Sequence, residues 1–212
     1  MIAHSYSSLN TWKKCPFQWE QQYKLKKFKG SFGEAAKAGV VIHEQIEKFI
    51  KGEREQLPSV LPKDDLVVKL RDMRVAGLDV VPEEALAVDR DFKPTKFFGK
   101  SVLLRGKVDV RWRIGDEVWA IDWKGGKRRP DDQKFQAKIY FAMLEAHYPG
   151  TSTHFVFDFL NNGRDKPLTA DGTEKEEVLD LINEVESAER FDPRPSPLCR
   201  WCPVVTCEYN ET

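Results

Sequence analysis

The stretch AIDWKGGKRR, residues 120–129, places an acidic and a basic side chain two residues apart near the end of an expected strand. Residues i and i+2 of a strand point to the same face, so Asp122 and Lys124 lie side by side. A carboxylate can hold a divalent cation, and a neighbouring ammonium can orient a water or balance a phosphate's charge. The pair fits metal-assisted hydrolysis, and it also fits an ordinary solvated strand face.

A second carboxylate is expected opposite the first. Gly115-Asp116 is a credible two-residue hairpin turn, and it predicts that Asp109 faces Asp122, with β-carbons about 4.5–5.5 Å apart. Like charges in that position repel, and magnesium or manganese between them would relieve the repulsion. Alternatively, this is simply the solvent-exposed face of the hairpin, because the positive side chains Arg105, Lys107 and Arg111 lie on it as well.

Two helices carry further candidates. His43 and Glu47 are i,i+4 neighbours on one helix, and Gln136 and Tyr140 are i,i+4 neighbours on the helix that follows Asp122. Histidine is a frequent metal ligand, but on a partly apolar helix it also serves as a packing residue. The Gln136–Tyr140 face either supports a site or meets solvent.

The four cysteines form an uneven set. Cys199, Cys202 and Cys207 are close together near the C-terminus, and Cys15 lies far upstream. Without a secretory signal, such a set is more typical of metal binding than of disulfides. Four thiolates suit structural zinc or an iron–sulfur cluster, and spacing alone does not choose between them. Unrelated reduced thiols are the remaining alternative.

The elements that must position these residues follow from periodicity. Helical spacing covers residues 35–50, with Gly52 as a stop, and also 64–77, 132–148 and 174–191. A period of two predicts strands over 86–92, 101–112, 117–123 and 153–160. Strand, helix and strand over 118–160 form a βαβ unit with a parallel crossover. The fold class is therefore α/β, with a mixed sheet between helices.

The bulk composition is that of a soluble globular protein. The chain has 212 residues, 32% of them charged with a formal net charge of zero, and no apolar run approaches the roughly 20 residues of a membrane helix. The N-terminus lacks a signal-type apolar segment, so we expect a cytoplasmic protein without membrane partners. Residues 1–30 are rich in lysine, whereas residues 171–189 are acidic and read as a solvated helix.

Taken together, these motifs resemble the RecB-type nucleases of the PD-(D/E)XK superfamily, in the iron–sulfur branch that includes CRISPR-associated and phage-borne exonucleases. The matching segments are SYSSLNTWKKCPFQW with the upstream cysteine, GVVIHEQIE, GKVDV, IDWKGGK, QAKIY and CRWCPVVTC. The resemblance covers nearly the whole chain. It implies one restriction-endonuclease-like domain over residues 1–212, with its core sheet in 86–160 and an iron–sulfur staple joining 1–30 to 190–212.

The resemblance also implies roles for the matching positions. His43, Asp109, Asp122 and the backbone carbonyl of Trp123 would bind Mn²⁺ or Mg²⁺, and Lys124 would position the attacking water. Gln136 and Tyr140 would contact DNA or support Lys124. A [4Fe-4S] cluster, or alternatively zinc, would be held by Cys15, Cys199, Cys202 and Cys207. The superfamily's additional upstream acidic residue is Asp89, Asp91 or absent.

The implied activity is hydrolysis of DNA by an exonuclease acting on single strands or frayed ends, in DNA processing or recombination. Lys127, Arg128 and Arg129 would meet phosphates. A helicase, a recombinase or a CRISPR integrase would be a separate partner. The alternatives are a non-catalytic DNA-end-binding module and a nuclease subunit that acts only in a complex.

Overall fold

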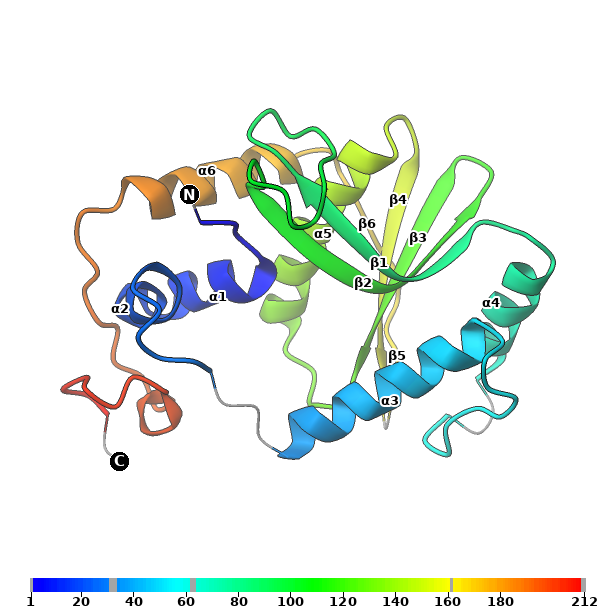
Figure 1. The fold of residues 1–212 in the computed structure, drawn as a ribbon, viewed down its shortest axis with the longest axis horizontal. Helices are drawn as coiled ribbons and strands as arrows, with labels where there is room; N and C mark the ends of the chain where they lie inside the picture. Colours follow the sequence, from blue (N-terminus) through cyan, green and yellow to red (C-terminus); the bar gives the residue numbers. More distant parts are fainter. Residues whose placement is uncertain (1, 31–33, 62–63, 161, 211–212) are drawn as a thin grey trace.

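A computed structural model describes residues 2–30, 34–61, 64–160 and 162–210, with the side chains of α3 described from residue 37 onward. Figure 1 shows a twisted sheet with helices on both faces. The helical elements are α1 (Tyr6–Lys14), α2 (Pro16–Trp19), the π-helical turn η1 (Glu20–Lys24), α3 (Glu34–Ile50), α4 (Asp65–Val75), α5 (Pro130–His147), α6 (Glu174–Ser187) and the 3-10 turn η2 (Cys199–Trp201). The strands are β1 (Val80–Val88), β2 (Leu104–Ile114), β3 (Glu117–Lys124), β4 (Ser152–Phe159), β5 (Gly163–Arg164) and β6 (Leu168–Thr169).

The sheet has the order β1-β2-β3-β4-β5, and β6 also pairs with β4. β2 pairs antiparallel with both β1 and β3, whereas β3 and β4 run parallel and are joined by the α5 crossover. The predicted hairpin register is confirmed, because Ile114 pairs with Glu117 and Trp112 pairs with Trp119. The mixed α/β class and the βαβ unit are confirmed as well.

Two apolar clusters flank the sheet. The larger cluster joins the sheet to α1, α5 and α6, and the smaller one joins it to α3 and α4. β4 shows the alternation, because Phe155 and Phe157 lie in the larger cluster and Val156 in the smaller. The sheet is therefore the middle layer of three, and side chains on either face can meet helices.

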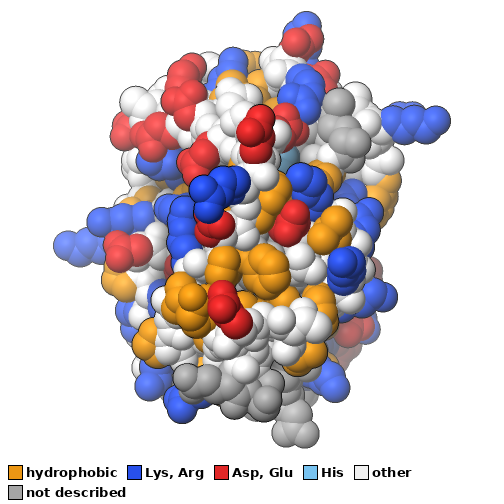
Figure 2. Space-filling model, turned by 90° about the vertical axis from the view of Figure 1, so that its left-hand side faces the viewer, with side chains coloured by type: hydrophobic (Ala, Val, Ile, Leu, Met, Phe, Trp, Pro, Cys, Tyr) orange, Lys and Arg blue, Asp and Glu red, His pale blue; other side chains and the backbone are white. Residues whose placement is uncertain are grey.

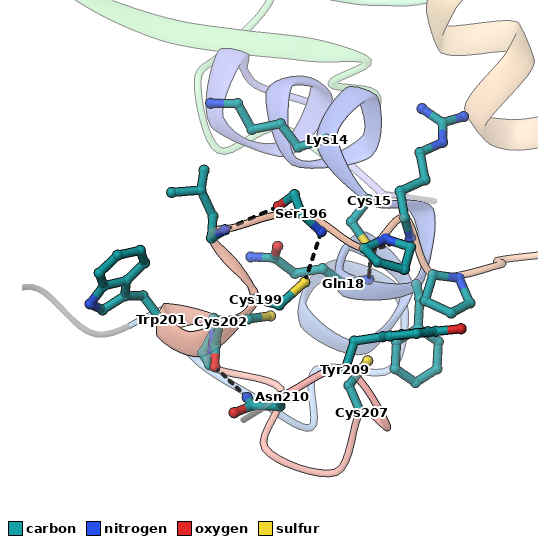
Figure 3. A pocket seen from close by; sticks show the side chains of 16 residues that line it. Lys14, Cys15, Gln18, Ser196, Cys199, Trp201, Cys202, Cys207, Tyr209 and Asn210 are labelled. Atoms are coloured by element: carbon teal, nitrogen blue, oxygen red, sulfur yellow. Dashed lines mark hydrogen bonds between the residues drawn. The ribbon is translucent and has the colours of Figure 1, made fainter. Parts of the chain in front are cut away.

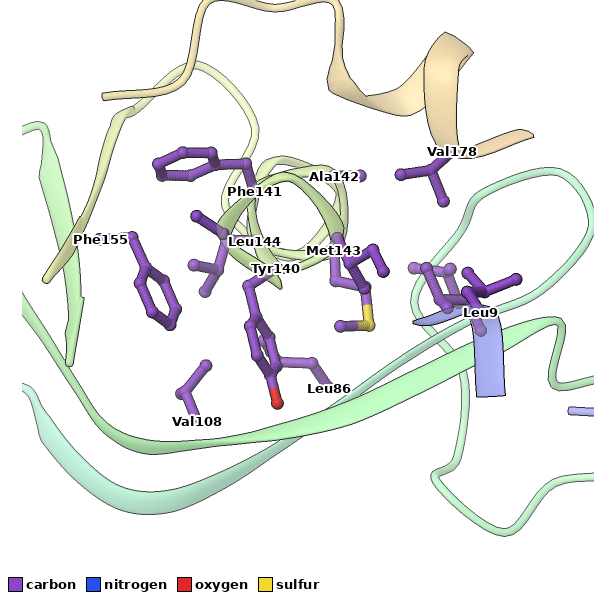
Figure 4. Packing of buried hydrophobic residues seen from close by; sticks show 14 of the residues in the cluster. Leu9, Leu86, Val108, Tyr140, Phe141, Ala142, Met143, Leu144, Phe155 and Val178 are labelled. Atoms are coloured by element: carbon purple, nitrogen blue, oxygen red, sulfur yellow. The ribbon is translucent and has the colours of Figure 1, made fainter. Parts of the chain in front are cut away.

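α5 is the most deeply buried helix near the hairpin. Figure 4 shows it end-on, with Tyr140 and Met143 toward β2 and Val178 of α6 on another side. Close approach to β2 depends on Gly106, because a Cβ there would lie 2.9 Å from Cε1 of Tyr140 and 3.1 Å from Cε of Met143. The missing side chain therefore lets the Gln136–Tyr140 face reach the strand that carries Asp109.

The expected strand over 86–92 is wrong in its position. The observed β1 begins at Val80 and ends at Val88. Its first half contains Pro82 and Glu83, and Glu83 has a left-handed φ of 52°. A proline argues against a strand in a sequence, yet β1 lies at the edge of the sheet, where proline is tolerated. The two-residue strands β5 and β6 are too short for a periodic signal.

The C-terminal tail returns to the N-terminal helices. The Arg194 guanidinium donates to the Lys13 carbonyl at 2.9 Å, and the tail runs beside α2 in Figure 1. On the face shown in Figure 2, acidic side chains gather in the upper part, the region of α6, and hydrophobic side chains gather lower down. Within the described ranges, no helix combines the length and apolarity that crossing a membrane requires.

Candidate active site and cysteine pocket

His43 and Asp109 meet although 66 residues separate them in the chain. The Nδ1 atom of His43, on α3, lies 3.2 Å from Oδ1 of Asp109, on β2. The other carboxylate oxygen of Asp109 accepts a 2.7 Å hydrogen bond from the Trp123 backbone N–H of β3. One carboxylate thus joins α3, β2 and β3 at a single point.

The two aspartates stand where the hairpin ladder stops. Backbone pairing of β2 with β3 extends as far as Val110 and Ile121, and Asp109 and Asp122 occupy the next position. There the Trp123 N–H bonds to a side chain in place of a backbone carbonyl. The expected neighbourhood of the two carboxylates is therefore confirmed.

Asp122, Lys124 and Gln136 form a closed triangle of contacts. The Lys124 ammonium lies 2.6 Å from Oδ2 of Asp122 and donates to Oε1 of Gln136 at 2.9 Å. Nε2 of Gln136 donates to Oδ1 of Asp122 at 2.7 Å. Asp122 and Gln136 are buried, so Gln136 holds the aspartate and the lysine together and does not face solvent.

The electrostatics of the site follow from this crowding. Burial, and then the negative charge of Asp109, raise the pKa of Asp122 to about 6. Burial alone would lower the pKa of His43, but the hydrogen bond and charge of Asp109 outweigh it and raise this pKa. The centre therefore holds negative charge in a poorly solvated place, an arrangement that a cation would stabilise.

Tyr140 is buried one helical turn beyond Gln136. Its hydroxyl donates to the Lys107 carbonyl at 2.6 Å, and its ring stacks on Phe155 with centroids 5.3 Å apart. The side chain therefore positions β2, two residues before Asp109, from inside the core.

The three basic residues after β3 differ from one another. Lys127 and Arg129 are exposed. Arg128 is engaged, because its guanidinium donates to Asp165 at 2.7 Å and to the carbonyls of Asn162 and Gly163 at 2.8 Å. To contact a phosphate, Arg128 would have to leave these partners.

Glu83 is a site neighbour that sequence reasoning missed. Burial and the charge of Asp109 raise its pKa, and its carboxylate lies 3.5 Å from the Lys107 ammonium. The β1–β2 pairing includes Pro82 with Val110 and Glu84 with Val108, and omits Glu83 and Asp109 between them. The distorted pair at the edge of the hairpin brings a third carboxylate to the centre. In the sequence, the only feature that could have pointed to Glu83 is its position directly after Pro82.

Asp89 and Asp91 do not occupy this place. Both follow the end of β1, and Oδ1 of Asp89 accepts hydrogen bonds from the backbone N–H groups of Asp91 and Lys93. Asp89 thus organises a turn.

All four cysteines line one pocket between the N-terminal helices and the tail, with a volume of about 430 Å³ (Figure 3). The sulfur of Cys15 accepts from the N–H groups of Gln18 at 3.5 Å and Arg194 at 3.4 Å. The sulfur of Cys199 accepts from the N–H of Ser196 at 3.3 Å. Burial raises the pKa of Cys202, and the other three thiols add to the rise. The four thiols thus surround one pocket, although Cys15 is far from the others in the chain.

Neither region closes into a finished coordination shell. Across the described residues, no three His, Cys, Asp or Glu side chains are arranged to hold a single metal ion. The centre around Asp109 and Asp122 offers oxygen and imidazole ligands, and the cysteine pocket offers sulfur.

Comparison with known proteins identifies the family. A search of curated proteins gave no match. Among solved structures, the crystal structure of SSO0001 is similar in fold, with a TM-score of 0.51 and 16% sequence identity, covering 100% of this chain and 89% of that one. The model of the PD-(D/E)XK nuclease superfamily matches residues 3–207. With His43, Asp109, Asp122 and Lys124 all inside that match, the chain belongs to the PD-(D/E)XK nuclease superfamily.

Proposed function

We propose that this protein is a metal-dependent deoxyribonuclease that hydrolyses phosphodiester bonds at the centre formed by Asp109, Asp122 and Lys124. The observation that carries the proposal is the convergence of His43, from α3, on the end of the hairpin that bears both aspartates. Four elements, α3, β2, β3 and α5, supply this centre with side chains of the types that phosphodiester hydrolysis needs.

The donor set fits a divalent cation. Two carboxylates and an imidazole are suitable ligands for manganese, and carboxylates with a backbone carbonyl suit magnesium. His43, Asp109, Asp122 and the Trp123 carbonyl would hold the ion. When bound, it would lower the pKa of a water and stabilise the charge that develops on the phosphate. Glu83 adds a third carboxylate at the edge of the same centre.

Lys124 and Gln136 act on the geometry of the reaction. The Lys124 ammonium can hold the attacking water by a hydrogen bond and offset the growing negative charge on the phosphate. Gln136 limits where that ammonium can go, because its carbonyl oxygen accepts from Lys124 while its amide nitrogen donates to Asp122. We therefore assign Gln136 the supporting role, one of the two that the motif resemblance implies for it.

The proposed ligand of the cysteine pocket is a [4Fe-4S] cluster, with structural zinc as the alternative. Four thiolates suit either group, and all four cysteines line this pocket. Backbone N–H groups donate to Cys15 and Cys199, and hydrogen bonds of this kind tune iron–sulfur clusters. Bound there, the cluster would tie α1 and α2 to the tail.

We infer from the motif resemblance that cleavage proceeds from DNA ends, on single-stranded or frayed substrates. Any helicase, recombinase or CRISPR integrase would then be a separate partner. The test uses anaerobically purified protein on end-labelled linear and circular single-stranded DNA, with manganese, magnesium or EDTA. Asp122→Ala is compared with Asp116→Ala, whose carboxyl is exposed in the hairpin turn.

Metal-dependent loss of linear DNA, by wild type and Asp116→Ala but not by Asp122→Ala, is the expected result. Cutting of circles would replace end-directed cleavage by an endonuclease activity at the same centre. No cleavage, with DNA still bound, would contradict catalysis by this chain alone and favour a binding module or a subunit of a complex.

A further inference from the structure

A second pocket is positively charged and lies apart from both the candidate active site and the cysteines. It has a volume of about 350 Å³ and lies between the segment after α2 and the beginning of β2. Lys26, Lys29 and Arg105 line it together with the rings of Tyr23 and Phe28, and no described lining residue is acidic. In a chain of zero net charge, three cations without an acidic residue among them form a distinctive surface.

No carboxylate in the described part of the chain forms an ion pair with Lys26, Lys29 or Arg105. Both lysines are exposed to solvent. Their charges are therefore free to meet an external polyanion.

The backbone beside the pocket is irregular in two ways. The turn Glu20–Lys24 is π-helical, with the Leu25 N–H donating to the Glu20 carbonyl at 2.8 Å. Lys26 then adopts a left-handed φ of 55°, which costs about 1–2 kcal/mol for an L-residue other than glycine. Such features are frequent at functional sites. Here they form the wall that presents Tyr23 and Lys26 to the pocket.

An aromatic loop stands next to Arg105. The Phe98 side chain is 85% exposed, and its ring meets that of Phe97 edge-on at 5.0 Å. Arg105 holds this pair, because its guanidinium lies 5.2 and 5.4 Å from the two ring centroids and donates to the Phe97 carbonyl at 3.1 Å. An exposed ring beside unpaired cations suits a nucleobase, which can stack on the ring while its phosphates meet the cations.

β2 connects this pocket to the candidate active site. Arg105 and Lys107 point to the same face of the strand, and Lys107 reaches Glu83 beside Asp109. Asp109 follows Arg105 by four positions, which is about 13 Å along a strand. That length corresponds to about four stacked nucleotides. A DNA strand lying along β2 could therefore occupy both places at once.

We propose that this pocket and Phe98 bind the single-stranded part of the DNA substrate, about four nucleotides from the bond that is cut. The proposal rests on the proposed nuclease function and specifies its substrate. Lys26, Lys29 and Arg105 contact phosphates, and Phe98 stacks on an unpaired base. A fully paired duplex offers no free base face, so the site selects single strands.

The test measures binding of a fluorescent oligothymidylate of twelve nucleotides over a series of salt concentrations. EDTA is present to remove divalent cations, so that no cleavage occurs. Phe98→Ala should weaken binding by about 5- to 150-fold, because one base loses its stacking partner. Lys26→Ala combined with Lys29→Ala should reduce the slope of log K against log salt by about 1.4, since each lost phosphate contact is worth about 0.7 on single strands. Val75→Ala and Lys69→Ala, exposed positions on α4, are the matched controls and should bind like wild type.

A blunt duplex of the same length separates stacking from charge. Phe98→Ala should leave duplex binding within about twofold of wild type. An equal loss on both substrates, or no loss on the oligothymidylate, would overturn the proposal. Cleavage by wild type with unaltered binding in the variants would overturn the pocket and leave the nuclease intact. Variant-dependent binding without cleavage by wild type would overturn the nuclease and leave the pocket as a DNA-binding site.

Discussion

The candidate catalytic residues and the four cysteines are held in different ways. His43, Asp109, Asp122 and Lys124 lie on long elements packed on the sheet, and each contacts another member of the centre or a backbone group of β3. The cysteines line a pocket whose outer wall is the tail, which contains only the three-residue turn η2 as regular structure in its described part. The first region is organised by the protein core.

The two regions differ in how much of the structure a bound metal would have to organise. At the centre around Asp109, the fold already brings the ligand-type side chains together, so an ion would find them in place. At the cysteine pocket, only a few N–H groups contact the sulfurs, and an iron–sulfur cluster would itself supply the cross-link between tail and helices. Loss of the ion from the centre around Asp109 should therefore abolish cleavage. Loss of the cluster from the cysteine pocket should instead destabilise the attachment of the tail.

The largest expected effect is loss of cleavage in Lys124→Ala. Removing the ammonium that positions the water should lower the cleavage rate by about 10² to 10⁴-fold. The midpoint of thermal unfolding should change little, because the surrounding elements are held by the core. Rate measurements with manganese, alongside thermal unfolding, check both parts. Lys166→Ala, an exposed position, is the control. A Lys124→Ala enzyme as fast as wild type would remove the active-site assignment.

The next effect belongs to the cysteine pocket. If the proposed cluster is bound, Cys199→Ser should remove the brown colour of the anaerobically purified protein and expose the tail to limited proteolysis, because the cross-link between tail and helices would be lost. Metal analysis, visible absorbance and the cleavage sites of the protease provide the measurement. Thr206→Ala, exposed in the same tail, should keep the colour. Colourless wild type with stoichiometric zinc would contradict the iron–sulfur cluster.

A smaller effect is expected where a residue supports the centre without acting on substrate. Gln136→Leu removes the hydrogen bonds to Lys124 and Asp122 and should lower activity or metal affinity by about 10- to 100-fold. Titration of the cleavage rate with manganese separates the two effects. If Gln136→Leu matched wild type at every metal concentration, the supporting role would be excluded.

The smallest effect is expected from the packing of α5 on β2. Gly106→Ala places a Cβ 2.9 Å from Tyr140 and should destabilise the fold by about 1–3 kcal/mol. For a chain of this size, each kcal/mol lowers the unfolding midpoint by roughly 2–4 °C. Gly126→Ala, where a Cβ would meet nothing within 4 Å, is the matched control. Equal midpoints for both variants would show that Tyr140 adjusts without cost.

Much of the site could be predicted from local sequence. The turn Gly115-Asp116 sets the hairpin register, and the register brings Asp109 next to Asp122. The two-residue spacing of Asp122 and Lys124 places them on one face because strand side chains alternate. Helical periodicity located α3 and α5, and the family resemblance implied that the tail returns to Cys15.

Only the tertiary structure decided the contacts that depend on packing between distant elements. Val80 lies in the cluster with α3, whereas Leu86 and Val88 of the same strand lie in the cluster with α5, so the alternation of β1 reverses near Glu83. A period-two pattern assumes an unbroken strand, and it cannot anticipate a left-handed residue that turns a carboxylate toward Asp109. Likewise, Arg128 engages Asp165 and two carbonyls because β5 folds back on β4, a long-range pairing that no local periodicity encodes.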